Sequence, residues 1–245
     1  MVDMTPRSHS FAFLSGWRGN SSALLIALLA LFLLHPLLDM TFSSHDLLIK
    51  IVTDILISVL WFVALYTVSR KNSTFIVAGL LLVPALISKL VFYAKNESVF
   101  LVVSHLSGFG LLVLVAAVIL AHVLRAERIT WNIIRGAICV YFVIGIAWAS
   151  LFASIELLHP GSFRFPVMDT ATANVINTDK QNFSWLLYYS FVTLTTVGYG
   201  DMSPVTPIAR TLAVLEAILG QFYIGVLIAR LMGFYILHSS QRDSE

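Results

Sequence analysis

The chain has 245 residues, of which 58% are hydrophobic and 11% charged, with a formal net charge of +2. Soluble domains are roughly 45–50% apolar and about 25% charged, so this composition excludes an ordinary cytosolic enzyme and also a disordered chain. The net charge is too small to suggest a nucleic-acid partner, and the single Cys139 excludes an intrachain disulfide. An integral membrane protein remains.

Six long apolar runs follow one another along the chain, and each can span about 30 Å of hydrocarbon as a helix. They lie at about 22–40, 46–69, 73–94, 98–124, 130–158 and 207–237. A seventh run, at about 183–196, is too short to cross the membrane twice and too hydrophobic for a solvated loop. It predicts a re-entrant segment, which is tolerated only where protein or a water-filled cavity surrounds it. We therefore expect an all-α membrane protein with six transmembrane helices and one re-entrant segment.

Cationic residues concentrate in the loops that six crossings would place on one side of the membrane. These cations are Arg7, Arg18, Arg70, Lys71, Arg125, Arg128, Arg135, Arg230 and Arg242. The loops on the other side are poorer in Lys and Arg, so the positive-inside rule predicts that both termini are cytoplasmic. An odd number of crossings would break this segregation. The first run has no obvious cleavage site before it, and we expect a retained helix rather than a signal peptide.

The fourth run is apolar from Phe100 to Leu124 and contains no arginine before Arg125. A voltage sensor needs several arginines spaced along such a helix, because each charge moved contributes about 2.3 kcal/mol per 100 mV. We therefore expect little or no voltage sensing through this helix.

The re-entrant run ends in the hexapeptide T-T-V-G-Y-G, Thr195–Gly200, which cannot continue a stable helix because two glycines alternate with Val197 and Tyr199. An extended strand whose carbonyls all point to one side needs unusual backbone angles, and glycine adopts these without steric cost. Four such strands around an axis would stack rings of carbonyl oxygens that replace the hydration shell of K⁺. The alternative is a glycine-rich turn between two helices.

With Asp201 and then Met202-Ser203-Pro204 after it, this hexapeptide resembles the selectivity-filter signature of potassium channels. The resemblance implies a tetrameric channel in which the re-entrant segment is a pore helix followed by the filter. It further implies that carbonyls of four filter residues coordinate the ion and that the threonine hydroxyl forms the innermost site. These residues are Thr196, Val197, Gly198 and Tyr199.

The resemblance also assigns residues that support the filter. Thr195, Gly200 and Asp201 flank the coordinating residues, and Tyr188 and Tyr189 occupy the positions of an aromatic cuff behind the filter. By the family pattern we expect Tyr189 to hydrogen-bond Asp201. Plain aromatic packing is the alternative for the two tyrosines.

The last apolar run fits the inner helix of the same family. Gly220 lies where the family has its hinge glycine. Gln221, Ile224 and Ile228 share one helix face, which the resemblance assigns to the water-filled cavity, and Met232 would narrow the intracellular mouth. Packing against lipid or another helix is the alternative for the two isoleucines.

Glu216 is unusual because a carboxylate inside a membrane helix is costly, and this makes it a functional hypothesis by default. It lies one turn outward of Gly220, level with the back of the filter on the family pattern. We expect it to hydrogen-bond a pore-helix hydroxyl such as Ser190 or Thr193. A filter-stabilising or gating role and a purely structural bond both remain open.

Four helices before a pore unit is the layout of the voltage-gated-like channel superfamily. On this layout, residues 1–21 form a cytoplasmic N-terminus and 22–125 a four-helix voltage-sensor-like domain without gating arginines. Residues 126–238 form the pore domain, with outer helix, pore helix, filter and inner helix, and 239–245 a cytoplasmic tail.

We expect a homotetrameric potassium channel in the plasma membrane, or the inner membrane of a bacterium. Its partners would be its own copies, membrane lipid and the transported K⁺, with no cofactor, no nucleic acid and no enzymatic activity. The alternatives within the class are a poorly selective cation channel and a regulatory subunit of a heteromeric potassium channel. A transporter or membrane enzyme would need inverted repeats or a polar catalytic cluster, and the sequence reveals neither.

Overall fold

The computed structural model of the chain describes residues 24–30, 32–33, 55–63, 65–66, 72–95, 97–126, 130–166 and 181–242. Within them the long elements are all helices: α3 (Asn72–Lys95), α4 (Ser98–Arg125), α5 (Trp131–Leu158), α6 (Gln181–Leu194) and α7 (Pro207–Arg242). Two short strands, β1 (Phe163–Arg164) and β2 (Ser203–Pro204), pair antiparallel. The described parts of the first two expected runs are helical, and their other residues lie outside the described ranges.

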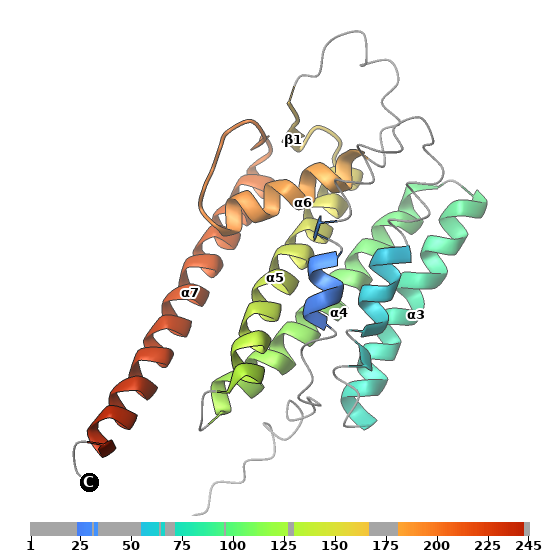
Figure 1. The fold of residues 1–245 in the computed structure, drawn as a ribbon. Helices are drawn as coiled ribbons and strands as arrows, with labels where there is room; N and C mark the ends of the chain where they lie inside the picture. Colours follow the sequence, from blue (N-terminus) through green and yellow to red (C-terminus); the bar gives the residue numbers. More distant parts are fainter. Residues whose placement is uncertain are drawn as a thin grey trace, which may run out of the picture.

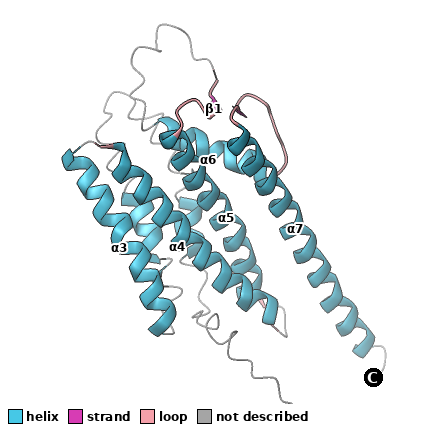
Figure 2. Ribbon diagram, turned by 180° about the vertical axis from the view of Figure 1, so that it is seen from behind, coloured by secondary structure: helices cyan, strands magenta, loops and turns pink. Residues whose placement is uncertain are grey.

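Among the described residues, four helices are long and apolar enough to cross a membrane: Thr74–Lys95, Ser98–Arg125, Trp131–Leu158 and Pro207–Arg230. They coincide with the last four long runs expected from the sequence. Helices suit these segments because a helix satisfies its backbone hydrogen bonds internally, as an apolar medium requires. Helix α6 has only 14 residues and lies across the end of the helix layer near β1, without following α5 or α7 along their length (Figures 1 and 2).

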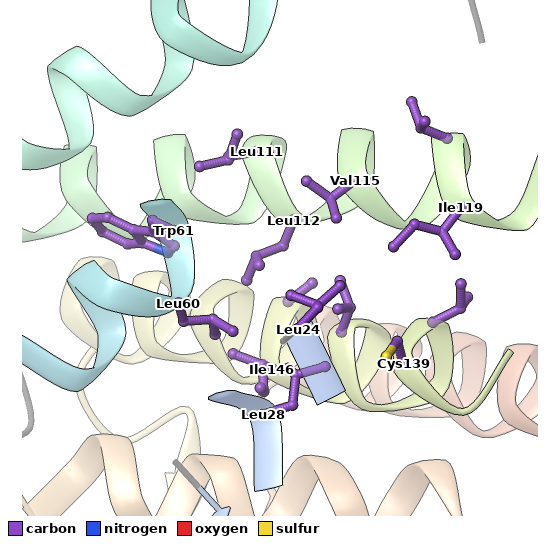
Figure 3. Packing of buried hydrophobic residues seen from close by; sticks show 14 of the residues in the cluster. Leu24, Leu28, Leu60, Trp61, Leu111, Leu112, Val115, Ile119, Cys139 and Ile146 are labelled. Atoms are coloured by element: carbon purple, nitrogen blue, oxygen red, sulfur yellow. The ribbon is translucent and has the colours of Figure 1, made fainter. Parts of the chain in front are cut away.

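The larger apolar core lies between α4, α5 and the helical segments at 24–30 and 55–63 (Figure 3). Leu111, Leu112 and Val115 of α4 are fully buried in it. Trp61 packs directly against the backbone of α4, because a Cβ atom on Gly108 would lie 2.6 Å from the Trp61 ring. Close packing of complementary shapes therefore joins the first helices to α4.

A second core joins the end of α5 to α6, β1 and the start of α7. The ring of Tyr189 meets those of Phe152 and Phe163 edge-on, at centroid distances of 5.4 and 5.3 Å. Farther along α6, the Phe191 ring lies where a Cβ atom on Gly145 would approach it to 2.7 Å. These contacts fix α6 against α5 and thereby position the loop that follows α6.

Candidate functional site

The loop between α6 and α7 begins where α6 ends at Leu194, and it has an alternating backbone conformation. Thr196, Gly198 and Gly200 have φ angles of 58°, 58° and 81°. The residues between them, Val197 and Tyr199, are not among those with positive φ. Every second residue of the loop therefore adopts the left-handed region that glycine enters freely.

This alternation is the pattern needed to line up carbonyls on one side of a strand. In an ordinary strand, successive residues face opposite sides. Reversing the handedness of every second residue turns successive carbonyls toward the same side. For Thr196 such a conformation costs about 1–3 kcal/mol, since a β-branched side chain rarely has positive φ. Contacts with the surrounding structure must offset this cost, and a strained residue of this kind indicates a functional constraint.

Backbone hydrogen bonds tie the start of the loop to the last turn of α6. The Thr196 N–H donates to Thr193 O at 2.9 Å, and the Val197 N–H donates to Val192 O at 3.0 Å. Beyond them the loop is exposed within one chain, with Val197 at 53% and Tyr199 at 71% exposure. The middle of the loop thus has an open side on which another molecule or copy can lie.

At the far end of the loop, Tyr188 is the residue that braces the backbone from α6. Its hydroxyl donates to Asp201 Oδ2 at 2.7 Å, and its ring stacks on Tyr199 with centroids 6.5 Å apart. The other oxygen, Asp201 Oδ1, accepts the Met202 N–H at 3.0 Å. The expected bond from Tyr189 to Asp201 is therefore wrong. One helix position turns the side chain by about 100°, which directs Tyr189 into the aromatic core with α5 and β1.

At the near end of the loop, α7 approaches the backbone where α6 ends. A Cβ atom on Gly220 would lie 2.1 Å from Leu194 O, so only glycine allows this approach. The next residue, Gln221, donates from Nε2 to Thr196 Oγ1 at 2.9 Å. The Tyr141 hydroxyl of α5 also donates to Leu194 O, at 3.3 Å. Two neighbouring helices therefore hold the base of the loop.

Glu216 of α7 has no solvent exposure and contacts α6. The Ser190 hydroxyl lies 2.5 Å from Glu216 Oε1 and 2.7 Å from Gly145 O, so it links α5, α6 and α7 at one point. Glu216 Oε2 has no hydrogen-bond partner among the described residues. The expected contact with Ser190 is thus present, and it leaves half of the carboxyl group unsatisfied.

The expected cavity and gate residues lie on an exposed side of α7. Ile224, Ile228 and Met232 are 38%, 55% and 58% exposed within one chain, and Gln221 is exposed as well. A different stripe of α7 is buried against the same chain, and it comprises Ala209, Ala213, Glu216 and Gly220. The apolar residues off this stripe need lipid or further copies of the chain to cover them.

Sequence reasoning missed Glu156, the last acidic residue of α5. It is 9% exposed, and its two oxygens accept the Gly161 N–H at 2.8 Å and the Phe163 N–H at 3.0 Å. This carboxylate shapes the turn into β1. Strand β1 pairs with β2, which follows the residues with alternating φ. A carboxylate within the last turn of an apolar run was the available signal.

Arg230 and Tyr223 of α7 were also not assigned a contact. The Arg230 guanidinium donates to Leu124 O and, at 2.6 Å, to Ala126 O, at the end of α4. The last carbonyls of a helix lack partners within it, so an arginine from another helix is a suitable cap. The Tyr223 hydroxyl donates to Ala137 O of α5 at 2.6 Å. Because these partners are more than 80 positions away in sequence, no local pattern indicates them.

Comparison with known proteins bears on the same part of the chain. A family model described as an ion channel matches residues 165–236. This part of the chain is similar to ion channels. The match extends over α6, the alternating loop and most of α7. With the four apolar helices it indicates a multi-pass membrane protein, and the similarity to an ion channel domain suggests passive ion conduction. No solved structure matched the chain.

Proposed function

We propose that the chain is one subunit of a homotetrameric potassium channel. In this proposal the Thr195–Gly200 segments of four copies surround one axis. The carbonyls of Thr196, Val197, Gly198 and Tyr199, with the Thr196 hydroxyl, replace water around K⁺. Rings of carbonyls from a TVGYG sequence are the known solution to potassium selection. Ions then pass down their gradient without a chemical step, so the proposal includes neither enzymatic activity nor a cofactor.

The observation that carries the proposal is the alternation of φ along T-T-V-G-Y-G. Positive φ at residues 196, 198 and 200 is the backbone pattern that a row of carbonyls with a common direction requires, and two of these positions are glycines. A turn that merely reversed the chain would need a single such residue or pair. The strained Thr196 in particular has no role in a simple turn.

One chain provides only one wall of such a pore, so the proposal requires four copies around the axis. The open side of the loop and the exposed apolar faces of α7 support this assembly. Val214, Phe222 and Val226 are 59%, 68% and 51% exposed in one chain. Part of this surface would face neighbouring copies, and the remainder would face lipid.

The proposed orientation places both termini in the cytoplasm, in a plasma membrane or the inner membrane of a bacterium. Its support is the distribution of cations between the loops. We also propose little intrinsic voltage sensing, since Arg125 at the end of α4 is its first arginine. The first four helices would then form a voltage-sensor-like domain without gating charges.

The experiment is recording from the purified chain in planar bilayers under opposed K⁺ and Na⁺ gradients. We expect a current that reverses near the potassium equilibrium potential. Gly198→Ala should abolish it, because alanine is strained at a φ of 58° and shifts the carbonyl ring. Gly161→Ala is the matched control, since Gly161 also has positive φ but lies in the turn before β1.

Other outcomes separate the alternatives. A reversal potential that ignores the K⁺ gradient indicates a poorly selective cation channel. A silent chain that gains current only with a second subunit indicates a regulatory subunit of a heteromeric channel. Intact K⁺ flux through Gly198→Ala contradicts the filter assignment.

A further inference from the structure

The base of the filter-like loop touches α7 at two successive residues. Because Gly220 has no side chain, Leu194 O can lie close to α7. The next residue, Gln221, donates from Nε2 to Thr196 Oγ1 at 2.9 Å. The bond joins residues 25 positions apart, on two different segments. Gln221 therefore does more than line a cavity, because its amide directly contacts the residue expected to form the innermost ion site.

Thr196 needs such a contact. It is the non-glycine residue with positive φ among the described parts of the chain, at 58°. Only contacts from the surroundings can hold a β-branched residue in that region. The Thr196 N–H is held by Thr193 O of α6, at 2.9 Å. The side-chain oxygen of the same residue is held by Gln221 of α7.

A count of lone pairs shows what the side-chain bond does. A threonine hydroxyl has one hydrogen and two acceptor lone pairs. When the Gln221 amide occupies one lone pair, the hydroxyl can no longer rotate freely. One lone pair remains for a cation, and its direction is fixed relative to α7. Loss of the amide would leave the oxygen present but unoriented.

We infer that Gln221 is a positioning residue for the innermost ion site, holding Thr196 Oγ1 so that its remaining lone pair faces the ion. The inference rests on the proposed function, because it assumes that Thr196 lines a conducting pore. Within that function it assigns to α7 a direct influence on which cations bind at the base of the filter, and how tightly.

The test uses Ba²⁺, a divalent cation close to K⁺ in size, as a probe of this site. A blocker that enters from the cytoplasmic side meets the innermost site first. Purified full-length protein is recorded in planar bilayers with K⁺ on both sides, and Ba²⁺ block is measured at each voltage polarity. Gln221→Met keeps the side-chain length but removes the amide. It should weaken block from the cytoplasmic side about two- to tenfold, as expected for the loss of one hydrogen bond.

A hydroxyl-dependence test separates positioning from a general disturbance. The Gln221→Met effect should persist on a Thr196→Ser background, which keeps the hydroxyl. It should vanish on Thr196→Val, which keeps the shape and lacks the hydroxyl. Thr196→Ala replaces the valine variant if that variant does not assemble. Leu80→Met, at an exposed position of α3 away from the loop, is the control and should leave block unchanged.

The outcomes distinguish this inference from the proposed function. If the wild-type protein carries no potassium-selective current, the proposed function and this inference both fail. If it conducts, but Gln221→Met leaves block unchanged or shifts it equally with and without the hydroxyl, only this inference fails. Where a variant conducts too weakly for recording, Ba²⁺ protection of the purified assembly against heating reports on the same site. There the same dependence on the Thr196 hydroxyl is expected.

Discussion

Helices α5 to α7 and the α3–α4 pair are both built from apolar segments, but different interactions join them. In the region from α5 to α7, side-chain hydrogen bonds connect segments distant in sequence. These bonds join Ser190 to Gly145, Tyr223 to Ala137, Tyr188 to Asp201 and Gln221 to Thr196. Between α3 and α4, apolar side chains such as those of Leu82 and Leu111 share one core, and the Ser104 hydroxyl donates to Ala85 O at 2.9 Å.

The difference indicates how precisely each region must hold its atoms in position. Apolar contacts are non-directional, so a packed helix pair tolerates small shifts at little cost. Hydrogen bonds have a narrow range of distances and angles, and a buried one that is lost leaves a costly unpaired group. A ring of ion-coordinating carbonyls needs positions fixed within a fraction of an ångström. The polar contacts are found around the loop for which the proposed function sets this requirement.

The largest effect is expected at Gly220. In Gly220→Ala the new methyl group would meet Leu194 O at 2.1 Å, and a backbone atom cannot move aside cheaply. Overpacking typically costs about 1–3 kcal/mol, and we expect the upper end here, with loss of current. Thermal unfolding of the purified protein and bilayer recording measure the two effects.

Gly225→Ala is the matched control, because no atom lies within 4 Å of the position that its new methyl group would occupy. Alanine also favours a helix over glycine by about 1 kcal/mol, so stability should hold or rise. The family pattern assigns Gly220 to a hinge, and a pure hinge role predicts that Gly220→Ala alters gating without destabilising the fold. That result would contradict the packing explanation.

The next largest effect concerns Ser190 and Glu216. Ser190→Ala removes the one hydrogen-bond partner that the described structure gives to this buried carboxyl group. An unsatisfied buried group costs about 1–3 kcal/mol, more if it is charged, so the unfolding temperature should fall. The double variant Ser190→Ala/Glu216→Leu removes both polar partners and should recover most of the loss. If the unfolding temperature of the double variant is no higher than that of Ser190→Ala, the Ser190–Glu216 bond is not what stabilises the contact between α6 and α7.

The sequence was sufficient for the elements that depend on local pattern. The apolar runs predicted α3, α4, α5 and α7 to within a few residues, because length and hydropathy alone determine such helices. The short run likewise predicted α6, and two glycines predicted the positive φ of the loop after it.

The rest depends on contacts between distant segments, which no local pattern encodes. The choice between Tyr188 and Tyr189 as the partner of Asp201 needed the rotation of α6 about its axis, which α5 sets through the Tyr189–Phe152 contact. The close approach of Gly220 to Leu194 also needed the position of α7. A hinge was the natural expectation for a glycine in a helix whose neighbours were unknown.

Glu156 tests whether the outer end of the site also depends on polar contacts. In Glu156→Gln, one carboxylate oxygen becomes an amide nitrogen, which cannot accept the N–H of Gly161 or Phe163. We expect a loss of about 1–2 kcal/mol and faster hydrogen exchange at these two amides. Glu97→Gln is the control, since Glu97 is exposed and makes no side-chain capping bond to α4. Equal exchange rates in Glu156→Gln and wild type would mean that the turn before β1 holds without this carboxylate.

The smallest effect is expected in the α3–α4 pair, at Ser104. Ser104→Ala removes one neutral hydrogen bond, but Ala85 O keeps its place within α3, where the Ser88 hydroxyl also approaches it at 3.4 Å. No buried acceptor is stranded, so the loss should be about 0.5 kcal/mol, at the low end for such bonds. The potassium current should be unchanged, because α4 is joined to α5 mainly by apolar side chains that a methyl-sized change does not reach. If Ser104→Ala instead lowered the unfolding temperature as strongly as Ser190→Ala, polar contacts in the two regions would carry equal weight. The contrast between a region fixed by hydrogen bonds and a helix pair packed by shape would then be wrong.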